Sequence, residues 1–304
     1  MEHELAETHS QASSNGTSGN RPVKRRHPDW IKVRMPAGPG YTQTKAIVST
    51  FKLNTVCQEA QCPNIGECWG HGTATFMLMG DVCTRNCRFC AVSHGRMVTL
   101  DPGEPRRVAE AARKMNLAHI VVTSVNRDDL PDGGAQHFAE TVHAIKDLNP
   151  DCAIEVLTPD FQGDESAVAT VAASPINIFN HNTESVPRLY KRVRPGAKYE
   201  RSLRVLEKAK AVRSNLKTKT GIMLGLGETY AELLTVFGDL RAVECDILTL
   251  GQYLQPSKEQ LPVERYVHPD EFKALREEAL SLGFRHVESG PLVRSSYHAW
   301  KHVE

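Results

Sequence analysis

Six of the eight cysteines in this chain of 304 residues fall into two groups of three. The spacing is C-x4-C-x5-C in the first group and C-x3-C-x2-C in the second. Three thiolates are one fewer than the four ligands of a structural zinc site. A four-iron cluster held by three thiolates has one iron left open, where a substrate can bind. The count therefore favours iron–sulfur chemistry. The groups are Cys57, Cys62 and Cys68, then Cys83, Cys87 and Cys90.

A zinc site is the alternative interpretation of each triplet, with His71 or His94 as the fourth ligand. The protein would then be a zinc-stabilised or electron-carrying module without turnover. Metal content separates these classes, because two four-iron clusters bring about eight irons and a brown colour, whereas zinc sites are colourless. The other two cysteines, Cys152 and Cys245, stand alone before strand-like runs, so we expect them in the core.

The segments that must position these cysteines alternate between strand-like and helix-like patterns from residue 73 onward. Short β-branched or apolar runs predict six strands, and amphipathic stretches between them predict helices. Thr229 and Glu232 form a predicted capping box just after a strand, and Pro269 and Gly283 bracket a later helix. The predicted strands are 73–79, 120–125, 153–157, 176–179, 218–226 and 246–253.

Repeated βα units imply an α/β fold with a parallel sheet and right-handed crossovers. Six units without a G-x-G-x-x-G after any strand fit a partial TIM-like (β/α)6 barrel better than a Rossmann sheet. Chemistry in such a barrel takes place at the carboxyl ends of the strands, where the second triplet lies. We divide the chain into a disordered tail, an extension carrying the first triplet, the barrel and a C-terminal segment. These are residues 1–29, 30–72, 73–290 and 291–304.

The overall composition narrows the choice of partners and location. The chain has 37 Lys plus Arg against 36 Asp plus Glu, so its net charge of +1 creates no general attraction to nucleic acid. Its longest apolar runs are far shorter than the roughly 18 residues of a membrane span. The N-terminal residues resemble neither a secretory signal nor a transit peptide. We therefore expect a cytoplasmic protein without nucleic-acid or membrane partners, whose cysteines are ligands.

The second triplet carries a family resemblance. Segment 83–90, CTRNCRFC, resembles the C-x3-C-x-aromatic-C signature of radical S-adenosylmethionine (SAM) enzymes. The resemblance implies that Cys83, Cys87 and Cys90 hold a 4Fe-4S cluster whose open iron binds the amino and carboxylate groups of SAM. An electron from that cluster would cleave SAM to a 5′-deoxyadenosyl radical. Phe89 would lie beside the adenine, or would simply be a core aromatic next to the loop.

The first triplet narrows the family further. Segment 57–68, CQEAQCPNIGEC, resembles the auxiliary-cluster motif of lipoyl synthases, and the likeness runs over about 30–298 without a departure at any motif position. The resemblance implies two 4Fe-4S clusters, of which the auxiliary one is the sulfur donor. Four more segments match that family, namely 71–77 (HGTATFM), 126–137 (NRDDLPDGGAQH), 193–199 (VRPGAKY) and 294–297 (RSSY).

This resemblance implies insertion of sulfur at C6 and C8 of a protein-bound octanoyl group. No acid, base or nucleophile among protein side chains activates such saturated C–H bonds, so a cofactor radical is needed. The implied partners are octanoylated lipoyl-domain proteins (2-oxoacid dehydrogenase subunits and the glycine cleavage H protein), a ferredoxin or flavodoxin as electron donor, and iron–sulfur carrier proteins. A biotin-forming or RNA-methylthiolating radical enzyme is the alternative, although the sequence shows no basic nucleic-acid module.

The fourth ligand of the auxiliary cluster comes from the resemblance alone. In lipoyl synthases a serine of the RSSY motif completes the site, which here implies Ser296, with Ser295 as the alternative. A serine pair near a C-terminus is otherwise a turn or cap. A hard oxygen suits an iron–sulfur cluster less well than a thiolate, so such a ligand is easily released.

Polar residues at strand ends are the candidates for binding SAM, because they face the reactants in a barrel. By analogy with relatives, we expect Asn126 and Asp128 to meet the ribose or amino group and Arg194 to meet the carboxylate. Each has an alternative role as a cap, turn or salt-bridge residue, and for Arg127 and Asp129 we prefer that role. Thr123 and Ser124 complete the predicted SAM-binding set.

Overall fold

Eight strands form one sheet in the order β1-β2-β5-β6-β7-β8-β9-β10 within the residues that the computed structural model describes, 27–33, 36–70 and 73–299. Only β1 pairs antiparallel with its neighbour, and all the other pairs in this sheet are parallel. The strands are β1 Asn54–Thr55, β2 Thr75–Leu78, β5 His119–Ser124, β6 Ala153–Leu157, β7 Ile178–Asn180, β8 Lys217–Leu224, β9 Ile247–Gln252 and β10 His286–Gly290.

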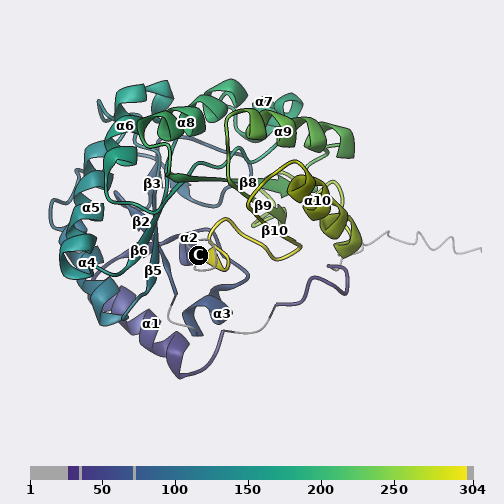
Figure 1. Ribbon diagram of the computed structural model, residues 1–304. Coiled ribbons are helices and arrows are strands. Elements are labelled where there is room, and N and C mark those ends of the chain that lie inside the picture. The colour runs from purple at the N-terminus through teal and green to yellow at the C-terminus, as the bar shows by residue number, and fades with distance from the viewer. Residues whose placement is uncertain (1–26, 34–35, 71–72, 300–304) are drawn as a thin grey trace, which may run out of the picture.

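The strand order is that of a barrel that does not close. Strands β1 and β10 stand at the two ends of the order, and helices surround the sheet on its outer side (Figure 1). All six predicted strands are confirmed, with boundaries shifted by one or two residues. The sequence reading missed β10, a seventh parallel strand that pairs with β9 from His286 to Gly290. The predicted partial barrel is therefore correct in kind and one strand short.

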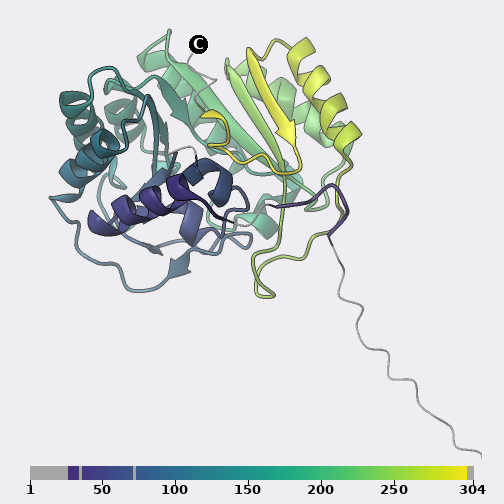
Figure 2. The same ribbon diagram turned by 90° about the horizontal axis from the view of Figure 1, so that it is seen from below.

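Most helices follow a strand and cover the barrel from outside, as Figures 1 and 2 show. The helix α9 begins with the expected capping box, because Thr229 Oγ1 accepts from the Glu232 N–H and the Glu232 side chain accepts from the Thr229 N–H. Pro269 starts α10, as predicted. The outer helices are α4 Glu104–Lys114, α5 Ala135–Leu148, α6 Glu165–Ala173, α8 Tyr199–Val212, α9 Tyr230–Ala242 and α10 Pro269–Ser281. Short helices η1 Phe161–Gly163, η2 Pro187–Leu189 and α7 Tyr190–Val193 lie in the loops.

The two faces of the strands differ in character. Outward-facing residues such as Ile120, Val122 and Ile154 are fully buried in the apolar core beneath the helices. Inward-facing positions carry charge: Lys219 of β8 donates to both carboxylate oxygens of Glu155 of β6, at 2.8 and 2.9 Å, and neither side chain is exposed. Burying two charges is costly unless they are paired closely. The barrel interior is therefore built for polar contacts.

The C-terminal segment contacts the N-terminal extension at the barrel opening. The N-terminal extension contributes α1 Pro39–Thr50, α2 Val56–Glu59 and α3 Ile65–Gly70. The C-terminal segment 291–299 runs back to this extension, because Asn64 Nδ2 donates to the Leu292 carbonyl at 2.7 Å and Tyr297 Oη donates to Glu67 at 3.1 Å. In Figure 1 this yellow segment lies inside the ring of strands, next to α2.

The predicted tail, 1–29, falls mainly outside the described residues. Its last three residues are described, and the ring of His27 lies edge-on to Tyr266 with 5.7 Å between centroids. His71, an alternative zinc ligand, also falls outside them.

Candidate active site

A cavity of about 460 Å³ lies at the carboxyl ends of the strands. Its walls come from all parts of the fold: the N-terminal extension, the loop after β2, the ends of the strands and the C-terminal segment. Cysteines from both triplets line it. They are Cys57 and Cys62 from the first group, and Cys83, Cys87 and Cys90 from the second.

The second triplet lies on the loop between β2 and α4, as predicted. Cys83 Sγ accepts hydrogen bonds from the main-chain N–H of Asn126 at 3.3 Å and from that residue's side-chain amide at 3.7 Å. The Arg85 N–H also points to this sulfur, at 3.4 Å. Burial raises the pKa of the Cys90 thiol to about 12. The Cys90 thiol is therefore protonated at neutral pH, and binding iron there must release a proton.

The first triplet is held by two short helices of the extension. Thr55 caps α2, which carries Cys57, and the Cys62 N–H donates to the Cys57 carbonyl at 3.1 Å. Cys68 lies in α3. Burial raises the pKa of Cys57 to about 11, and burial together with the neighbouring Cys62 and Cys57 thiols raises that of Cys68 to about 12.

The two serines of the RSSY motif face different neighbours. Ser296 Oγ accepts a hydrogen bond of 2.8 Å from Thr75 Oγ1, and the Thr75 backbone lies near enough to the Cys57 thiol to lower its pKa. Ser295 Oγ instead donates to Asn182 Oδ1 at 2.8 Å and accepts from Asn180 Nδ2 at 3.0 Å. Ser296 is therefore the serine on the side of the first triplet, whereas Ser295 is engaged with loop residues of the barrel.

The predicted SAM-binding residues do not share one environment. Ser124, Asn126 and Arg194 line the cavity, and so do Phe89 and Thr123. The Ser124 hydroxyl and Arg194 Nε are buried and have no hydrogen-bond partner, so they are available to a bound molecule. Thr123 Oγ1 is already bonded to the Leu157 carbonyl at 2.8 Å. This hydrogen bond links β5 to β6, so Thr123 supports the cavity wall.

Asp128 requires a correction. Its carboxylate accepts two hydrogen bonds from Arg85, at 2.6 and 2.8 Å, and the residue is not part of the cavity wall. The sequence places Asp128 two residues after Asn126, but the chain turns there and sends the two side chains in different directions. Arg127 and Asp129, for which we expected a cap, turn or salt-bridge role, form an ion pair with nitrogen–oxygen distances of 2.9 and 2.8 Å.

Sequence reasoning missed Glu184 on the cavity wall. Its carboxylate accepts from Asn182 Nδ2 at 3.0 Å, and burial raises its pKa, although Arg194 nearby opposes this. Arg194 donates to the Asn182 carbonyl at 2.7 Å. A half-buried carboxylate and a half-buried guanidinium thus stand on one wall beside Cys87, a pair suited to the amino and carboxylate groups of an amino acid. The sequence signal would have been a charged residue in the loop after a strand.

The arrangement of ligands fits clusters better than single ions. Among the described residues, no group of three or more His, Cys, Asp or Glu side chains converges on one point as a metal ion requires. A four-iron cluster offers irons at separate corners, so its thiolates need not converge. His94, the other alternative zinc ligand, is exposed, and its Nδ1 bonds to the Val92 carbonyl at 3.1 Å. Three soft thiolates per group are the donors that iron–sulfur clusters use.

Two solved structures of low sequence identity have a similar fold. Methylornithine synthase (PylB) aligns with a TM-score of 0.54 at 13% identity and covers 81% of each chain. Streptococcus suis SuiB bound to S-adenosylmethionine gives a TM-score of 0.57 at 11% identity, over 75% of this chain and 54% of that one. At this level of identity the likeness shows the fold alone.

Sequence comparison gives the class and then the family. A model of the radical SAM superfamily matches residues 77–240, so the barrel with its cysteine loop is that of a radical SAM enzyme. A model for the N-terminal domain of lipoyl synthase matches residues 2–62. Lipoyl synthase of Halorhodospira halophila is 57% identical over 94% of this chain and 86% of its own length. The lipoyl synthase of Caldanaerobacter subterraneus is 56% identical over 90% of this chain and 96% of its own length.

The chain belongs to the lipoyl synthase family. Its enzymes synthesise lipoyl groups, and their cofactors are SAM and two 4Fe-4S clusters. In the part of the chain that the structure describes, no helix is both long and apolar enough to cross a membrane.

Proposed function

We propose that the two cysteine triplets hold the two 4Fe-4S clusters and divide the reaction between them. Cys83, Cys87 and Cys90 would hold the cluster that binds SAM, and Cys57, Cys62, Cys68 and Ser296 would hold the auxiliary cluster that donates sulfur. The observation that carries this proposal is the single cavity lined by cysteines of both triplets and by Ser296. A sulfur donor must lie close to the carbon that receives the sulfur, and a shared cavity supplies that proximity.

The substrate in this proposal is an octanoyl group on a lipoyl-domain protein, with sulfur inserted at C6 and C8. When bound and reduced, SAM supplies a 5′-deoxyadenosyl radical, the kind of reagent that removes hydrogen from a saturated carbon. The protein supplies position and exclusion of water. Apolar side chains such as Met77, Ile222 and Val293 line the same cavity and suit an aliphatic chain.

The proposed SAM contacts follow from what is free on the cavity wall. Arg194, with its unpartnered Nε, would bind the carboxylate, and Glu184 would accept from the amino group. Asn126 and Ser124 would meet the ribose, and Phe89 would lie against the adenine. Thr123 would support this wall through its bond to Leu157. Asp128 is left out because Arg85 occupies its carboxylate.

The same proposal assigns the segments and partners. Residues 30–72 form the extension that supplies auxiliary-cluster cysteines, residues 73–290 form the barrel, and residues 291–304 form the closing segment. All eight cysteines are free thiols, which supports a reducing, cytoplasmic location. We propose lipoyl domains of 2-oxoacid dehydrogenase subunits and the glycine cleavage H protein as substrates. A ferredoxin or flavodoxin would provide electrons, and iron–sulfur carriers would rebuild the auxiliary cluster.

The test uses anaerobically reconstituted protein with a reductant, SAM and an octanoylated lipoyl-domain peptide. We expect 5′-deoxyadenosine together with a peptide mass gain that corresponds to two sulfur atoms. Formation of 5′-deoxyadenosine without any sulfur on the peptide, in protein carrying both clusters, would contradict the proposed substrate. A protein that binds zinc and no iron would contradict the cluster assignment.

A further inference from the structure

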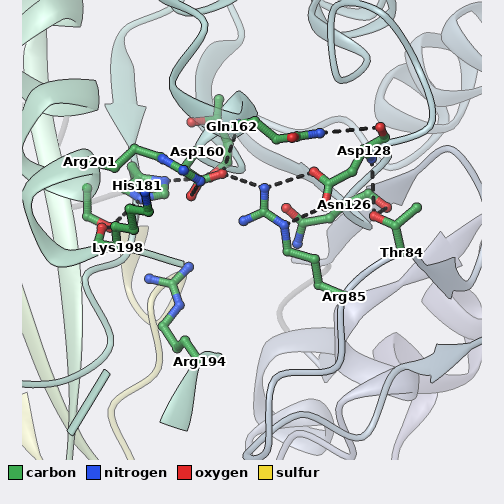
Figure 3. Close-up of polar contacts among 12 residues, drawn as sticks. Thr84, Arg85, Asn126, Asp128, Asp160, Gln162, His181, Arg194, Lys198 and Arg201 are labelled. Atoms are coloured by element: carbon green, nitrogen blue, oxygen red, sulfur yellow. Dashed lines mark hydrogen bonds and ion pairs between the residues drawn. The ribbon is translucent and has the colours of Figure 1, made fainter. Parts of the chain in front are cut away.

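Arg85 lies in the cysteine loop between Cys83 and Cys87, and its side chain binds two carboxylates of the barrel. It is 7% exposed and forks between two carboxylates, which Figure 3 shows at its centre. Nε and Nη2 bond to Asp128 at 2.6 and 2.8 Å, and Nη2 also reaches Asp160 at 2.7 Å. A planar guanidinium with several donors is the side chain best suited to such a double contact.

The two carboxylates belong to neighbouring strands of the barrel. Asp128 follows β5 and Asp160 follows β6, so Arg85 ties the cysteine loop to both strand ends (Figure 3). Thr84 strengthens the link, because its N–H and its hydroxyl both donate to the Asn126 carbonyl, at 3.1 and 3.0 Å. The Asp128 N–H then donates to Thr84 Oγ1 at 3.1 Å. These contacts hold the cysteine loop against the ends of β5 and β6.

The turn that presents Asp160 is conformationally strained. Phe161 and Gln162 follow it with φ angles of 45° and 54°, a strained region of backbone conformation that residues with side chains avoid. Such strain persists only where surrounding contacts impose it. Here the Gln162 N–H donates to Asp160 at 3.1 Å, and the Gln162 side chain donates to the Asp128 carbonyl at 3.3 Å. The strained turn keeps the unexposed Asp160 carboxylate aimed at Arg85.

Charges in this group balance. Arg201 Nη1 also bonds to Asp160, at 3.1 Å, so two arginines face two aspartates. We name Arg85, Asp128, Asp160 and Arg201 the Arg85 clamp. Removing one member leaves an unbalanced charge in a largely buried place, two residues from Cys83 and Cys87. Charges act over longer range in such surroundings than in water.

We propose that Arg85 is a positioning residue for the catalytic cluster. The Arg85 clamp holds the cysteine loop in place, and its balanced charges set the electrostatic potential that determines the reduction potential of the cluster. The inference rests on the proposed assignment of Cys83, Cys87 and Cys90 to the cluster that binds SAM. It assigns Asp128 and Asp160 to the support of that cluster. If the clamp only stabilised the fold, the direction of any change in the reduction potential would not follow the sign of the charge that a substitution removes.

The test measures the midpoint potential of the electron paramagnetic resonance signal that changes on addition of SAM, in the full chain with both clusters. Arg85→Gln leaves a negative charge in excess, which disfavours adding an electron, so we expect a lower potential. Asp160→Asn leaves a positive charge in excess, so we expect a higher potential. The double variant should return towards the wild type. Arg85→Lys keeps the charge but not the fork, so its potential should stay near the wild type while iron is lost faster.

Arg127→Gln is the matched control, because Arg127 is equally buried and is bidentate to Asp129, outside the cavity wall. It should leave the potential unchanged. Equal potentials in wild type, Arg85→Gln and Asp160→Asn, or shifts in the same direction, would overturn the inference. If Arg85→Gln retains no cluster, Asp160→Asn and Asp128→Asn still test the inference, because each removes a negative charge and must raise the midpoint potential. A wild-type protein without any signal that responds to SAM would instead overturn the cluster assignment and the inference with it.

Discussion

Thr75 Oγ1 donates a hydrogen bond of 2.8 Å to Ser296 Oγ, across 221 residues of sequence. Thr75 begins β2, and its backbone lies near enough to the Cys57 thiol to lower its pKa, so the serine and the first triplet share one neighbour. Ser295 faces the other way, towards Asn180 and Asn182. This geometry supports Ser296, rather than Ser295, as the oxygen ligand of the auxiliary cluster.

Ser296→Ala should abolish sulfur insertion while SAM cleavage continues, because the catalytic cluster depends on Cys83, Cys87 and Cys90. Ser296→Cys should give a more stable auxiliary cluster and a poorer sulfur donor, since thiolate suits iron better than alkoxide. Peptide mass and 5′-deoxyadenosine yield measure the two half-reactions. Full transfer of both sulfurs by the cysteine variant would show that a labile ligand is unnecessary. A defect in Ser295→Ala with none in Ser296→Ala would move the ligand by one residue.

Cys87→Ala should reduce SAM cleavage to background. The variant removes one of three thiolates from the cluster with the open iron, and with it the source of the electron. The measurement is 5′-deoxyadenosine formed per chain under reducing, anaerobic conditions. Cys152→Ala, at a buried lone cysteine, is the control and should cleave SAM at the wild-type rate. Cleavage at that rate by Cys87→Ala would refute the catalytic role of this triplet.

Cys62→Ala should separate the two half-reactions. Cys62 lies in the first triplet, so its loss removes the sulfur donor but not the radical source. We expect 5′-deoxyadenosine to form while the octanoyl peptide keeps its mass. The same variant should contain about half the iron of the wild type, roughly four irons instead of eight. Lipoyl product at the wild-type level would exclude the donor role of Cys57, Cys62 and Cys68.

Glu155→Gln should destabilise the fold by about 3–5 kcal/mol, because it leaves the buried Lys219 ammonium without its counter-charge. Replacing both residues, as in Glu155→Leu with Lys219→Met, should recover most of that loss. Urea unfolding followed by far-ultraviolet circular dichroism provides the free energies. Arg106→Gln breaks an exposed ion pair with Glu110 and should change stability by less than about 1 kcal/mol. Equal effects of Glu155→Gln and Arg106→Gln would contradict the energetic importance of the buried pair.

Local sequence patterns were sufficient to predict the elements that depend on interactions between residues a few positions apart. Six strands, the capping box of α9 and the start of α10 were predicted because apolar runs and cap residues act over a few positions. The strand β10 was missed because Val287 is the only large apolar residue among its five. A short edge strand of this kind is defined by its partner β9 and not by its own pattern.

In the candidate site, too, local sequence patterns predicted some features, whereas contacts between distant residues determined the others. The cysteine loop was predicted from spacing and from its place after the first strand. The partner of Asp128 was not, because no spacing rule connects it with Arg85, which is 43 residues away. Glu184 was missed for a similar reason: its place on the cavity wall depends on how the loop after β7 folds back to pair with Ile222. The choice between Ser295 and Ser296 also needed three-dimensional contacts.

The meeting of Thr75 with Ser296 has a consequence for how the protein is made. The cysteines of the extension are translated before the RSSY motif. At about 5–20 residues per second, the 221 residues between the two contacts take roughly 10–45 s to synthesise. During this interval the nascent chain presents three thiols without Ser296, the oxygen ligand proposed for their site. Assembly of the auxiliary cluster in the proposed coordination must therefore wait until the RSSY motif has been translated.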